Sequence, residues 1–326
     1  MEKKSNRSKH ILLAIVLAAC MLACGGWLFT HNGFDYHEKG GEEASTEQDY
    51  HELVVDGERY EYNTDILSVL ALGIDRQDAK EQGQSDFISM ILFDRETERI
   101  HILSISRDAM TPIVLYAADG TQLGWETQHL ALAYANGSDE QSGAFNSIKA
   151  VSKLLHDIPI VYYATADLNA FASVQSVVGE LQVIVPDDSL SYLNIGWDQG
   201  MSITLNDQNV ERFLRSRNTE RAFTNDTRMK RQQVYMKAYI EKLKQLLQED
   251  YEGTLRKMLK AYQSFSTNIS LEDIDSFAQM ALTYTVNDQS FQSVAGKDQE
   301  GKFHDEFIVD QDALMKQMVR LFYKKK

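Results

Sequence analysis

The sequence predicts an α/β fold, in a single domain that follows an N-terminal membrane anchor. Three observations support this prediction. From about residue 61 to residue 326, apolar runs typical of buried strands alternate with segments whose apolar residues recur at helical spacing. No linker or low-complexity run separates them. At 326 residues, with 43% hydrophobic and 25% charged residues, the chain is long enough to bury one sizeable core.

The first thirty residues predict the anchor. An uncharged run, Ile11 to Thr30, would span about 30 Å as a helix, which matches one hydrocarbon core. Positively charged flanks stay in the cytoplasm, so the rest of the chain is expected outside. The alternative is a lipoprotein signal, because Val16 to Cys20 is similar to a cleavage box that would leave a lipid on Cys20. Apolar residues that continue to Phe29 favour the uncleaved anchor.

The predicted organisation has four parts. They are a cytoplasmic tail at 1–10, a transmembrane anchor at 11–30, an acidic extracellular spacer at 31–61 and the α/β domain at 62–326. A short strand is expected within the spacer, near Leu53 to Val55. Both cysteines, Cys20 and Cys24, lie in the anchor, so the exported body has no disulfide and no cysteine chemistry.

Charge is distributed unevenly along the chain. Without residues 1–30, which hold four basic residues and one acid, the body carries 29 basic and 47 acidic residues, a net charge of −18. This balance argues against non-specific binding of nucleic acid. One stretch is nevertheless basic, with two acids against seven basic residues: Arg212, Arg215, Arg217, Arg221, Arg228, Lys230 and Arg231.

Three strands are expected in succession at the start of the domain: Ile66–Ile74, Phe87–Phe93 and Ile100–Ser106. If they alternate in direction, the end of the first, the start of the second and the end of the third meet at one edge of the sheet. Asp75, Asp86 and Arg107 would then be neighbours. A crossover after the first strand would separate them.

The remaining elements follow in order. We expect a loop at Thr111–Asn136, a helix through Phe145 to Leu155, a strand at Ile158–Thr165, a helix at Leu168–Val178 closed by Gly179, and a strand at Leu181–Pro186. The last three are expected to form one strand, helix, strand unit. We then expect a helix at Leu205–Leu214, a helix capped by Asn225 or Asp226 and striped from Met229 to Leu247, a helix opened by Ser270 and Asp273 and ending at Ala281, a strand at Phe307–Val309 and a helix at Asp312–Phe322.

The basic stretch has spacings that suit phosphate oxygens. Arg215 and Arg217 are two apart, so they point the same way in an extended segment. Arg228 and Gln232 are four apart, so they share a helix face. Two such donor pairs would form a fork for a phosphate group. The alternative is a solvated basic face that pairs with carboxylates elsewhere.

Two carboxylates beside arginines predict a divalent cation and a phosphorylated ligand. Asp75 and Asp86 would hold Mg²⁺ or Mn²⁺, which shares phosphate oxygens with the substrate. The alternative is that both are ordinary loop acids. The sequence has no histidine pair at zinc spacing, no GxxxxGK loop and no glycine-flanked elbow around Ser104 or Ser106.

Six motifs resemble, in order, those of the LytR-CpsA-Psr (LCP) family. They are LGID at 72–75, GQSD at 83–86, SISRD at 104–108, AYANG at 133–137, LRSR at 214–217 and the D-x-R-x-x-R-Q-Q run at 226–233. The resemblance implies a three-layer α/β/α fold with a mixed central sheet. It also implies an enzyme on the outer face of the membrane. Such an enzyme transfers a glycopolymer, for example teichoic acid or capsular polysaccharide, from undecaprenyl pyrophosphate to peptidoglycan.

The resemblance also implies roles for particular residues. The metal-linked aspartates of the family fall on Asp75 and Asp86. Its pyrophosphate-holding and catalytic residues fall on five positions: Arg107, Arg215, Arg217, Arg228 and Gln232. The family further implies an apolar pocket for the polyprenyl chain, for which five residues are candidates that could equally be plain core: Phe145, Ile148, Phe171, Val174 and Val177.

Three positions depart from the family pattern. Gln84 replaces the usual arginine of the pyrophosphate site, His129 lies near the place of a lysine, and Ser106 replaces a proline. A hydrogen bond to a charged group contributes about 1.5 to 3 kcal/mol, so the loss at position 84 could reduce function ten- to a hundredfold unless Arg76 or Arg221 compensates. Two alternatives therefore remain: a binding protein that holds the lipid carrier without turnover, and an envelope regulator, since members have been called transcriptional attenuators.

Overall fold

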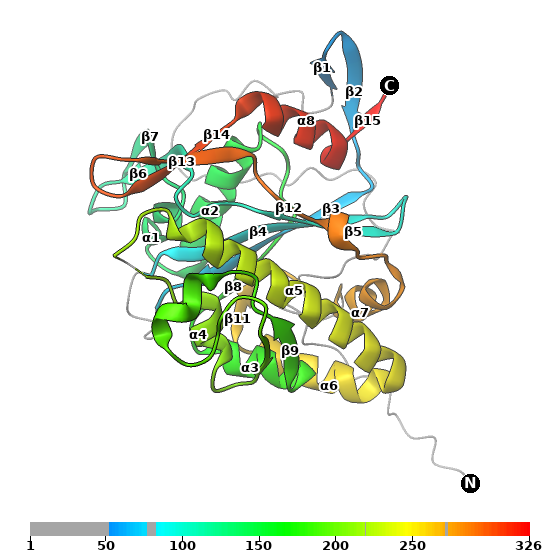
Figure 1. Cartoon of the computed structure of the whole chain (residues 1–326). Helices are drawn as coiled ribbons and strands as arrows, with labels where there is room; N and C mark the ends of the chain where they lie inside the picture. The colour runs from blue at the N-terminus through cyan, green and yellow to red at the C-terminus, as the bar shows by residue number, and fades with distance from the viewer. Residues whose placement is uncertain (1–51, 77–82, 219, 271–272) are drawn as a thin grey trace.

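The computed structural model describes residues 52–76, 83–218, 220–270 and 273–326 (Figure 1). Its centre is a six-stranded sheet in the order β11-β8-β3-β4-β5-β12. The strands are β3 (Ile66–Ile74), β4 (Ser85–Asp94), β5 (Arg99–Ser104), β8 (Tyr162–Ala166), β11 (Phe265–Thr267) and β12 (Phe291–Ser293). Strand β4 is antiparallel to both β3 and β5, whereas β8 is parallel to β3 and β12 is parallel to β5. The sheet is therefore mixed.

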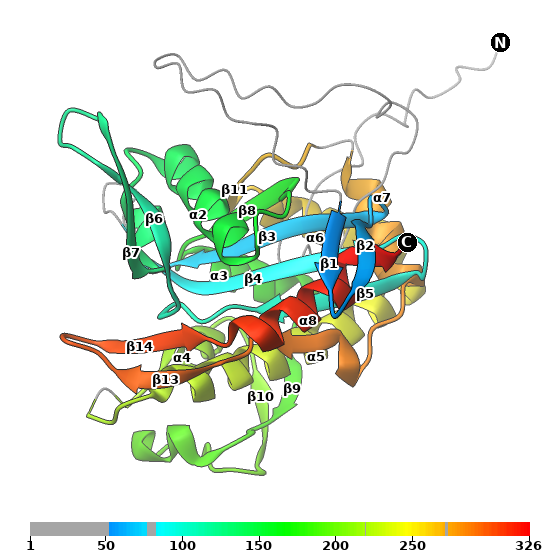
Figure 2. The same ribbon diagram turned by 90° about the horizontal axis from the view of Figure 1, so that it is seen from above.

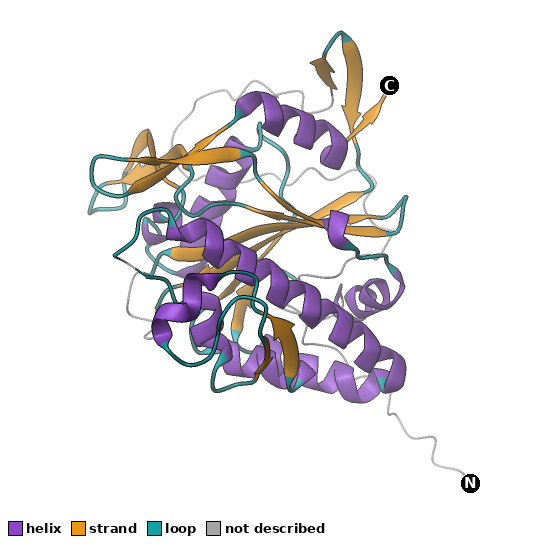
Figure 3. Ribbon diagram, viewed as in Figure 1, coloured by secondary structure: helices purple, strands orange, loops and turns teal. Residues whose placement is uncertain are grey.

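Helices cover both faces of this sheet (Figures 1 and 3). One face packs against α3 (Ala170–Val178), α4 (Val210–Arg215), α5 (Thr224–Glu249), α6 (Tyr251–Tyr262) and α7 (Asp273–Thr283). The other face packs against α1 (Leu132–Ala135), α2 (Glu140–Leu154) and α8 (Gln311–Phe322). Successive residues of β3 alternate between the two apolar cores, with Val69 in one and Leu70 in the other, because side chains alternate across a strand. The predicted three-layer α/β/α fold is confirmed.

Smaller sheets surround the central one. A three-stranded sheet joins β1 (Glu52–Val55), β2 (Glu58–Tyr62) and β15 (Tyr323–Lys325). Three two-stranded antiparallel sheets are formed by β6 (Met110–Tyr116) with β7 (Gln122–His129), β9 (Leu181–Ile184) with β10 (Ser202–Leu205), and β13 (Gly296–Glu300) with β14 (Asp305–Val309). Seen from above, β6–β7 and β13–β14 extend from the end of the sheet where β3 stops and β4 starts (Figure 2). Short 3-10 helices occupy Asp188–Leu193 and Asp288–Ser290.

Most predicted elements are confirmed within a few residues. Strand β3 has the predicted bounds, and β3, β4 and β5 alternate in direction as expected. The expected caps also occur: Gly179 ends α3 with φ of 72°, and Ser270 exchanges hydrogen bonds with Asp273 at the start of α7. Helix α6 was not predicted.

Three predictions were wrong. The loop expected at 111–136 contains the β6–β7 hairpin and α1. Much of β7 is exposed, so it carries little of the apolar alternation that identifies a strand. The helix expected from Leu205 begins only at Val210, after β10. The strand, helix and strand from 158 to 186 do not share a sheet, because β9 pairs with β10 rather than with β8.

The start of α5 also differs from the prediction. The helix begins at Thr224, after Phe223 with φ of 57°, so Asn225 and Asp226 lie in its first turn rather than at its cap. The Asn225 side chain donates a hydrogen bond to Ser106 Oγ (2.9 Å), just after the end of β5.

Predictions for the N-terminal segment lie outside the described residues. These are the cytoplasmic tail, the anchor with Cys20, and the spacer up to residue 51. Residues 52–61, which the sequence places at the end of the spacer, form β1 and most of β2. Among the helices that the structure describes, none combines the length and apolar character needed to cross a membrane.

Candidate functional site

The candidate site lies at the edge of the sheet where β3 ends and β4 begins. The backbone N–H of Asp75 donates to the carbonyl oxygen of Gln84 (2.9 Å), which fixes the two strand ends side by side. Arg107 follows β5 on the other side of β4, and its guanidinium donates to the Asp86 carboxylate. The predicted neighbourhood of Asp75, Asp86 and Arg107 is therefore confirmed.

Helix α5 adds a buried arginine to this edge. Arg228 is only 1% exposed, and its Nη1 donates to Asp86 Oδ2 (2.8 Å). Its Nη2 donates to Asn225 Oδ1 (2.7 Å), so Asn225 links the guanidinium to Ser106. The family usually has proline at position 106, and proline has no side-chain polar group. In this chain the Ser106 hydroxyl accepts from Asn225 and so supports Arg228 through it.

The end of α4 supplies the second group of arginines. Arg215 Nη2 donates to Asp75 Oδ1 (2.6 Å), and its Nη1 donates to Glu211 Oε1 (2.7 Å). Arg217, two residues later, lines a polar cavity together with Arg107, Arg215 and residues of the strand ends. Segments more than a hundred residues apart in sequence therefore converge, as the basic stretch predicted.

Arg231 has a role that the sequence analysis did not assign. Its side chain is completely buried, and Nε donates to the carbonyl oxygen of Phe213 (3.0 Å). The other two nitrogens donate to Ser216 O and Ser189 Oγ. These contacts hold the last turn of α4, which carries Arg215 and leads to Arg217. Its three-residue spacing from Arg228 indicated a shared buried face, and that signal could have identified it.

Burial and mutual repulsion act on the arginines. Desolvation lowers the pKa of Arg107 to about 10, opposed by attraction to Asp108 and assisted by repulsion from Arg228. Desolvation, followed by repulsion from Arg217, lowers the pKa of Arg228 to about 10 as well. Both groups stay charged near neutral pH. Arg228 Nε is buried without a hydrogen-bond partner among the described residues.

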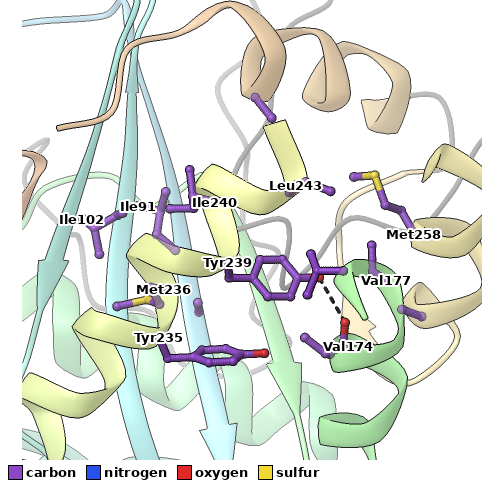
Figure 4. Close-up of a cluster of buried hydrophobic side chains, with 14 of the residues drawn as sticks. Ile91, Ile102, Val174, Val177, Tyr235, Met236, Tyr239, Ile240, Leu243 and Met258 are labelled. Atoms are coloured by element: carbon purple, nitrogen blue, oxygen red, sulfur yellow. Dashed lines mark hydrogen bonds between the residues drawn. The ribbon is translucent and has the colours of Figure 1, made fainter. Parts of the chain in front are cut away.

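An apolar cavity opens onto this cluster. It lies between the sheet, α3 and α5, and its walls include Phe171, Val174, Tyr235, Met236, Tyr239 and Ile240. Figure 4 shows Tyr239 turned toward α3, where its hydroxyl donates to Val174 O (3.1 Å). The Tyr235 hydroxyl likewise donates to Gln175 Oε1 (3.0 Å), so both tyrosine hydroxyls have hydrogen-bond partners in the protein. At its polar end the cavity is lined by Asp75, Asp86, Arg215, Arg228 and Gln232.

The candidates for the apolar pocket divide between the two faces of the sheet. Phe171 and Val174 line the cavity, and Val177 belongs to the core on the same face. Phe145 and Ile148 pack in the core on the opposite face, so their assignment to the pocket is excluded. The shared face of Arg228 and Gln232 is confirmed, because both line the cavity's polar end.

Comparison with known proteins agrees with this geometry. The sequence model of the LytR_cpsA_psr family matches residues 29–322. The chain belongs to this family. It is 27% identical over 223 residues to the polyisoprenyl-teichoic acid–peptidoglycan teichoic acid transferase TagT of Bacillus subtilis (strain 168), covering 64% of this chain and 62% of TagT. The corresponding transferase TagV of the same organism is 30% identical over 123 residues, covering 37% of this chain and 28% of TagV.

A solved structure supports the fold. The crystal structure of B. subtilis TagV superposes with a TM-score of 0.61 at 25% identity, covering 79% of this chain and 96% of that one. The sequence alignments, in contrast, span less than two thirds of the curated relatives' lengths.

The departures from the LCP pattern have clear positions. Gln84 Oε1 accepts a hydrogen bond from Arg107. Arg76 cannot replace the missing arginine, because it is buried against Glu140 and also faces Asp167 (3.9 Å). Arg221 lines the polar cleft that contains Gln84, so it is the better candidate for compensation.

Asp75 and Asp86 could hold a divalent cation only together with oxygen ligands from water or a phosphate. Within the described ranges, no cluster of three or more His, Cys, Asp or Glu side chains could hold a metal ion. Asp75 and Asp86 line the same two cavities as Arg215 and Arg228. Two carboxylates suit Mg²⁺, which completes its coordination with water and phosphate oxygens. The donor set therefore fits an ion that arrives with a phosphate ligand.

Proposed function

We propose that this LCP protein transfers a glycopolymer from a polyprenyl diphosphate carrier to peptidoglycan. One observation carries the proposal: an apolar cavity ends at a cluster of arginines and carboxylates. A ligand with a long apolar chain and a diphosphate group has the matching chemistry, because the chain avoids water and the phosphates pair with guanidinium groups. The names of TagT and TagV support a teichoic acid type of polymer and a peptidoglycan acceptor.

The arginines would bind and neutralise the diphosphate. In the proposed reaction an acceptor hydroxyl forms a bond to the phosphorus that bears the glycopolymer. The bridging P–O bond then breaks, polyprenyl phosphate leaves, and the hydroxyl proton passes to solvent or a base that we do not assign. Negative charge grows on the leaving phosphate, where Arg215 and Arg228 lie beside the apolar cavity. Arg107, Arg217 and Gln232 would hold the remaining oxygens.

Asp75 and Asp86 would hold Mg²⁺ or Mn²⁺ when the ligand is bound. The ion would supply further positive charge next to the phosphates. Both carboxylates now accept hydrogen bonds from arginines, and phosphate oxygens would draw those donors away. The requirement for a divalent cation can be measured by comparing transfer activity in the presence of EDTA with the activity after Mg²⁺ is added back.

The proposal places the domain outside the cell, tethered by residues 11–30. The supporting observation is the uncharged run behind four basic residues. A reporter fused after residue 217 tests this topology. A reporter signal from the cytoplasm would overturn it and favour a regulatory role instead.

The activity test uses the full-length chain in detergent with a polyprenyl diphosphate-linked sugar polymer and peptidoglycan. We expect transfer with Mg²⁺, and we expect Asp75→Ala and Arg217→Ala each to abolish it. Lys230→Ala is the matched control, since Lys230 belongs to the same basic stretch but pairs with Asp226 (2.6 Å) on the surface. Unchanged activity in both site variants would refute the site.

A second candidate is a protein that binds the carrier without turnover. Gln84, where the family usually has arginine, favours it. The discriminating variant is Gln84→Arg, which restores a cation beside Arg107. Activity that appears only in this variant would support the binding protein, whereas activity in the wild-type chain supports the transferase.

A further inference from the structure

Besides the apolar cavity and the polar cavity described above, the arginine cluster borders a third opening, a polar cleft that the proposed function does not yet use. Arg107 and Arg217 line this cleft, whereas Arg215 and Arg228 line the apolar cavity. The two openings thus reach the cluster at different arginines. A ligand whose lipid occupies the apolar cavity and whose diphosphate contacts all four arginines would extend into the cleft. The cleft volume is about 630 Å³, within the range of small-molecule sites.

The walls of the cleft suit a ligand rich in hydroxyl groups. Its lining includes a cationic donor, Arg221, an anionic acceptor, Glu220, and an imidazole, His129. The cleft thus offers neutral and acidic acceptors as well as cationic donors. A sugar hydroxyl both donates and accepts, so it can use both kinds of group.

An aromatic ring stands at the rim of the cleft. Phe303 is 80% exposed, more than any other large hydrophobic residue that the structure describes. It also lines the cleft, beside His304. The ring lies under the ammonium group of Lys302, which is 5.0 Å from its centroid. The ring is therefore accessible to a ligand that occupies the cleft, and it would gain apolar contact if such a ligand covered it.

The hairpin that carries Phe303 is fixed to the site. Phe307 in β14 donates its backbone N–H to the carbonyl oxygen of Asp108 (2.8 Å), the residue after Arg107. His129 Nε2 donates to the carbonyl oxygen of Asp305 (3.0 Å). The Asp305 carboxylate accepts from the backbone N–H of Phe223 (2.7 Å), just before α5. Strand β14, which follows the turn at 301–304, is therefore held by Asp108, by His129 of β7 and by Phe223.

We propose that this cleft binds the sugar attached to the terminal phosphate of the lipid diphosphate, with the Phe303 ring as its stacking surface. The apolar C–H face of a pyranose packs on an aromatic face, and its hydroxyl groups reach the polar walls. The inference rests on the proposed function and assigns the part of the substrate that the β13–β14 hairpin reads. It makes Phe303 a specificity-determining residue rather than a catalytic one.

The test compares two lipids on the full-length chain in detergent. One is farnesyl diphosphate, and the other is farnesyl diphosphate with one N-acetylhexosamine on the terminal phosphate. We expect the wild-type chain to bind the sugar-bearing lipid more tightly. Phe303→Ala should weaken that lipid alone by about three- to tenfold, and Phe303→Trp should retain it. Leu123→Ala is the matched control, because Leu123 is also an exposed apolar residue (67%) but lies on the β6–β7 hairpin and does not line the cleft.

Two results would overturn this inference while leaving the proposed function intact. The first is equal affinity of the wild-type chain for both lipids. The second is a Phe303→Ala variant that binds the sugar-bearing lipid as well as the wild-type chain does, or that loses both lipids equally. Failure of the wild-type chain to bind either lipid would overturn the proposed function itself.

Discussion

The candidate site has an inner half and an outer half that differ in burial. The inner half is Asp86 with Arg107 and Arg228, whose side chains are 18%, 15% and 2% exposed. The outer half is Asp75 with Arg215, which are 43% and 31% exposed, together with Arg217. The same pairing of carboxylate and guanidinium therefore occurs in two environments, and the difference separates residues that support the fold from residues that serve the ligand alone.

The physical reason is desolvation. A buried ion pair that loses one partner leaves a charge without water, so the fold becomes less stable. An exposed ion pair is screened by solvent and contributes little to stability. The inner half should therefore couple ligand binding to the stability of the sheet edge, whereas the outer half should be free to exchange a carboxylate for a phosphate.

The largest effect is expected for Arg228→Met. The change removes the donor to Asp86 and to Asn225 from a buried position, and should lower the free energy of unfolding by about 3 kcal/mol. Arg215→Met is the matched control in the outer half, with an expected change within about 1 kcal/mol. Chemical denaturation measures both. An equal loss in the two variants would remove the distinction between the halves.

Arg231→Met should have the next largest effect and links the two halves. Loss of its bonds to Phe213 O and Ser216 O should cost about 2 to 3 kcal/mol of stability. It should also weaken diphosphate binding, because the end of α4 carries Arg215 and leads to Arg217. In an Arg217→Ala background the further loss of affinity should be small. Additive losses of affinity would show that Arg231 does not act through this segment.

Asp75→Asn should change metal dependence rather than stability. The outer position makes the expected stability change less than about 1 kcal/mol. The Mg²⁺ concentration needed for half-maximal transfer should rise, because one of the two carboxylates near the phosphates loses its charge. A titration of activity with Mg²⁺ checks this. An unchanged requirement would exclude Asp75 from the metal site.

The smallest effect concerns Asp298, which lies on β13. Burial, followed by repulsion from Asp226, Asp108 and Asp305, raises the pKa of Asp298 from its ordinary 3.8 to about 6. Because the folded state holds this proton more tightly than the unfolded chain, the group's stabilising contribution is present below about pH 3.8 and is lost as the pH rises through 6. Asp298→Asn should therefore raise Tm at neutral pH and have little effect near pH 4. The opposite trend would contradict the shift.

The candidate site could be predicted better than its surroundings. The run Ile66–Ile74 and the two strands after it have clear apolar patterns, and their alternation places Asp75, Asp86 and Arg107 together. The i,i+4 spacing of Arg228 and Gln232 predicts their shared face. These signals are local, so a single sequence contains them.

The rest could not be predicted because it depends on distant contacts. His129 reaches Asp305 across 176 positions, and no pattern in β7 or β14 indicates that pairing. The position of Phe303 at the cleft depends on where the β13–β14 hairpin docks, and this hairpin is held by contacts with Asp108 and Phe223. Asn225 likewise lies inside α5 and contacts Ser106, 119 positions away, instead of capping the helix.

Titration of the full-length chain in detergent with farnesyl diphosphate, followed by phosphorus NMR, tests the central claim most directly. If the two halves surround one diphosphate, both phosphorus resonances should shift on binding. Arg107→Ala and Arg217→Ala should each reduce the affinity about tenfold or more, and Lys230→Ala should not. Equal affinity in the wild-type chain and all three variants would contradict the convergence of these arginines on a single ligand.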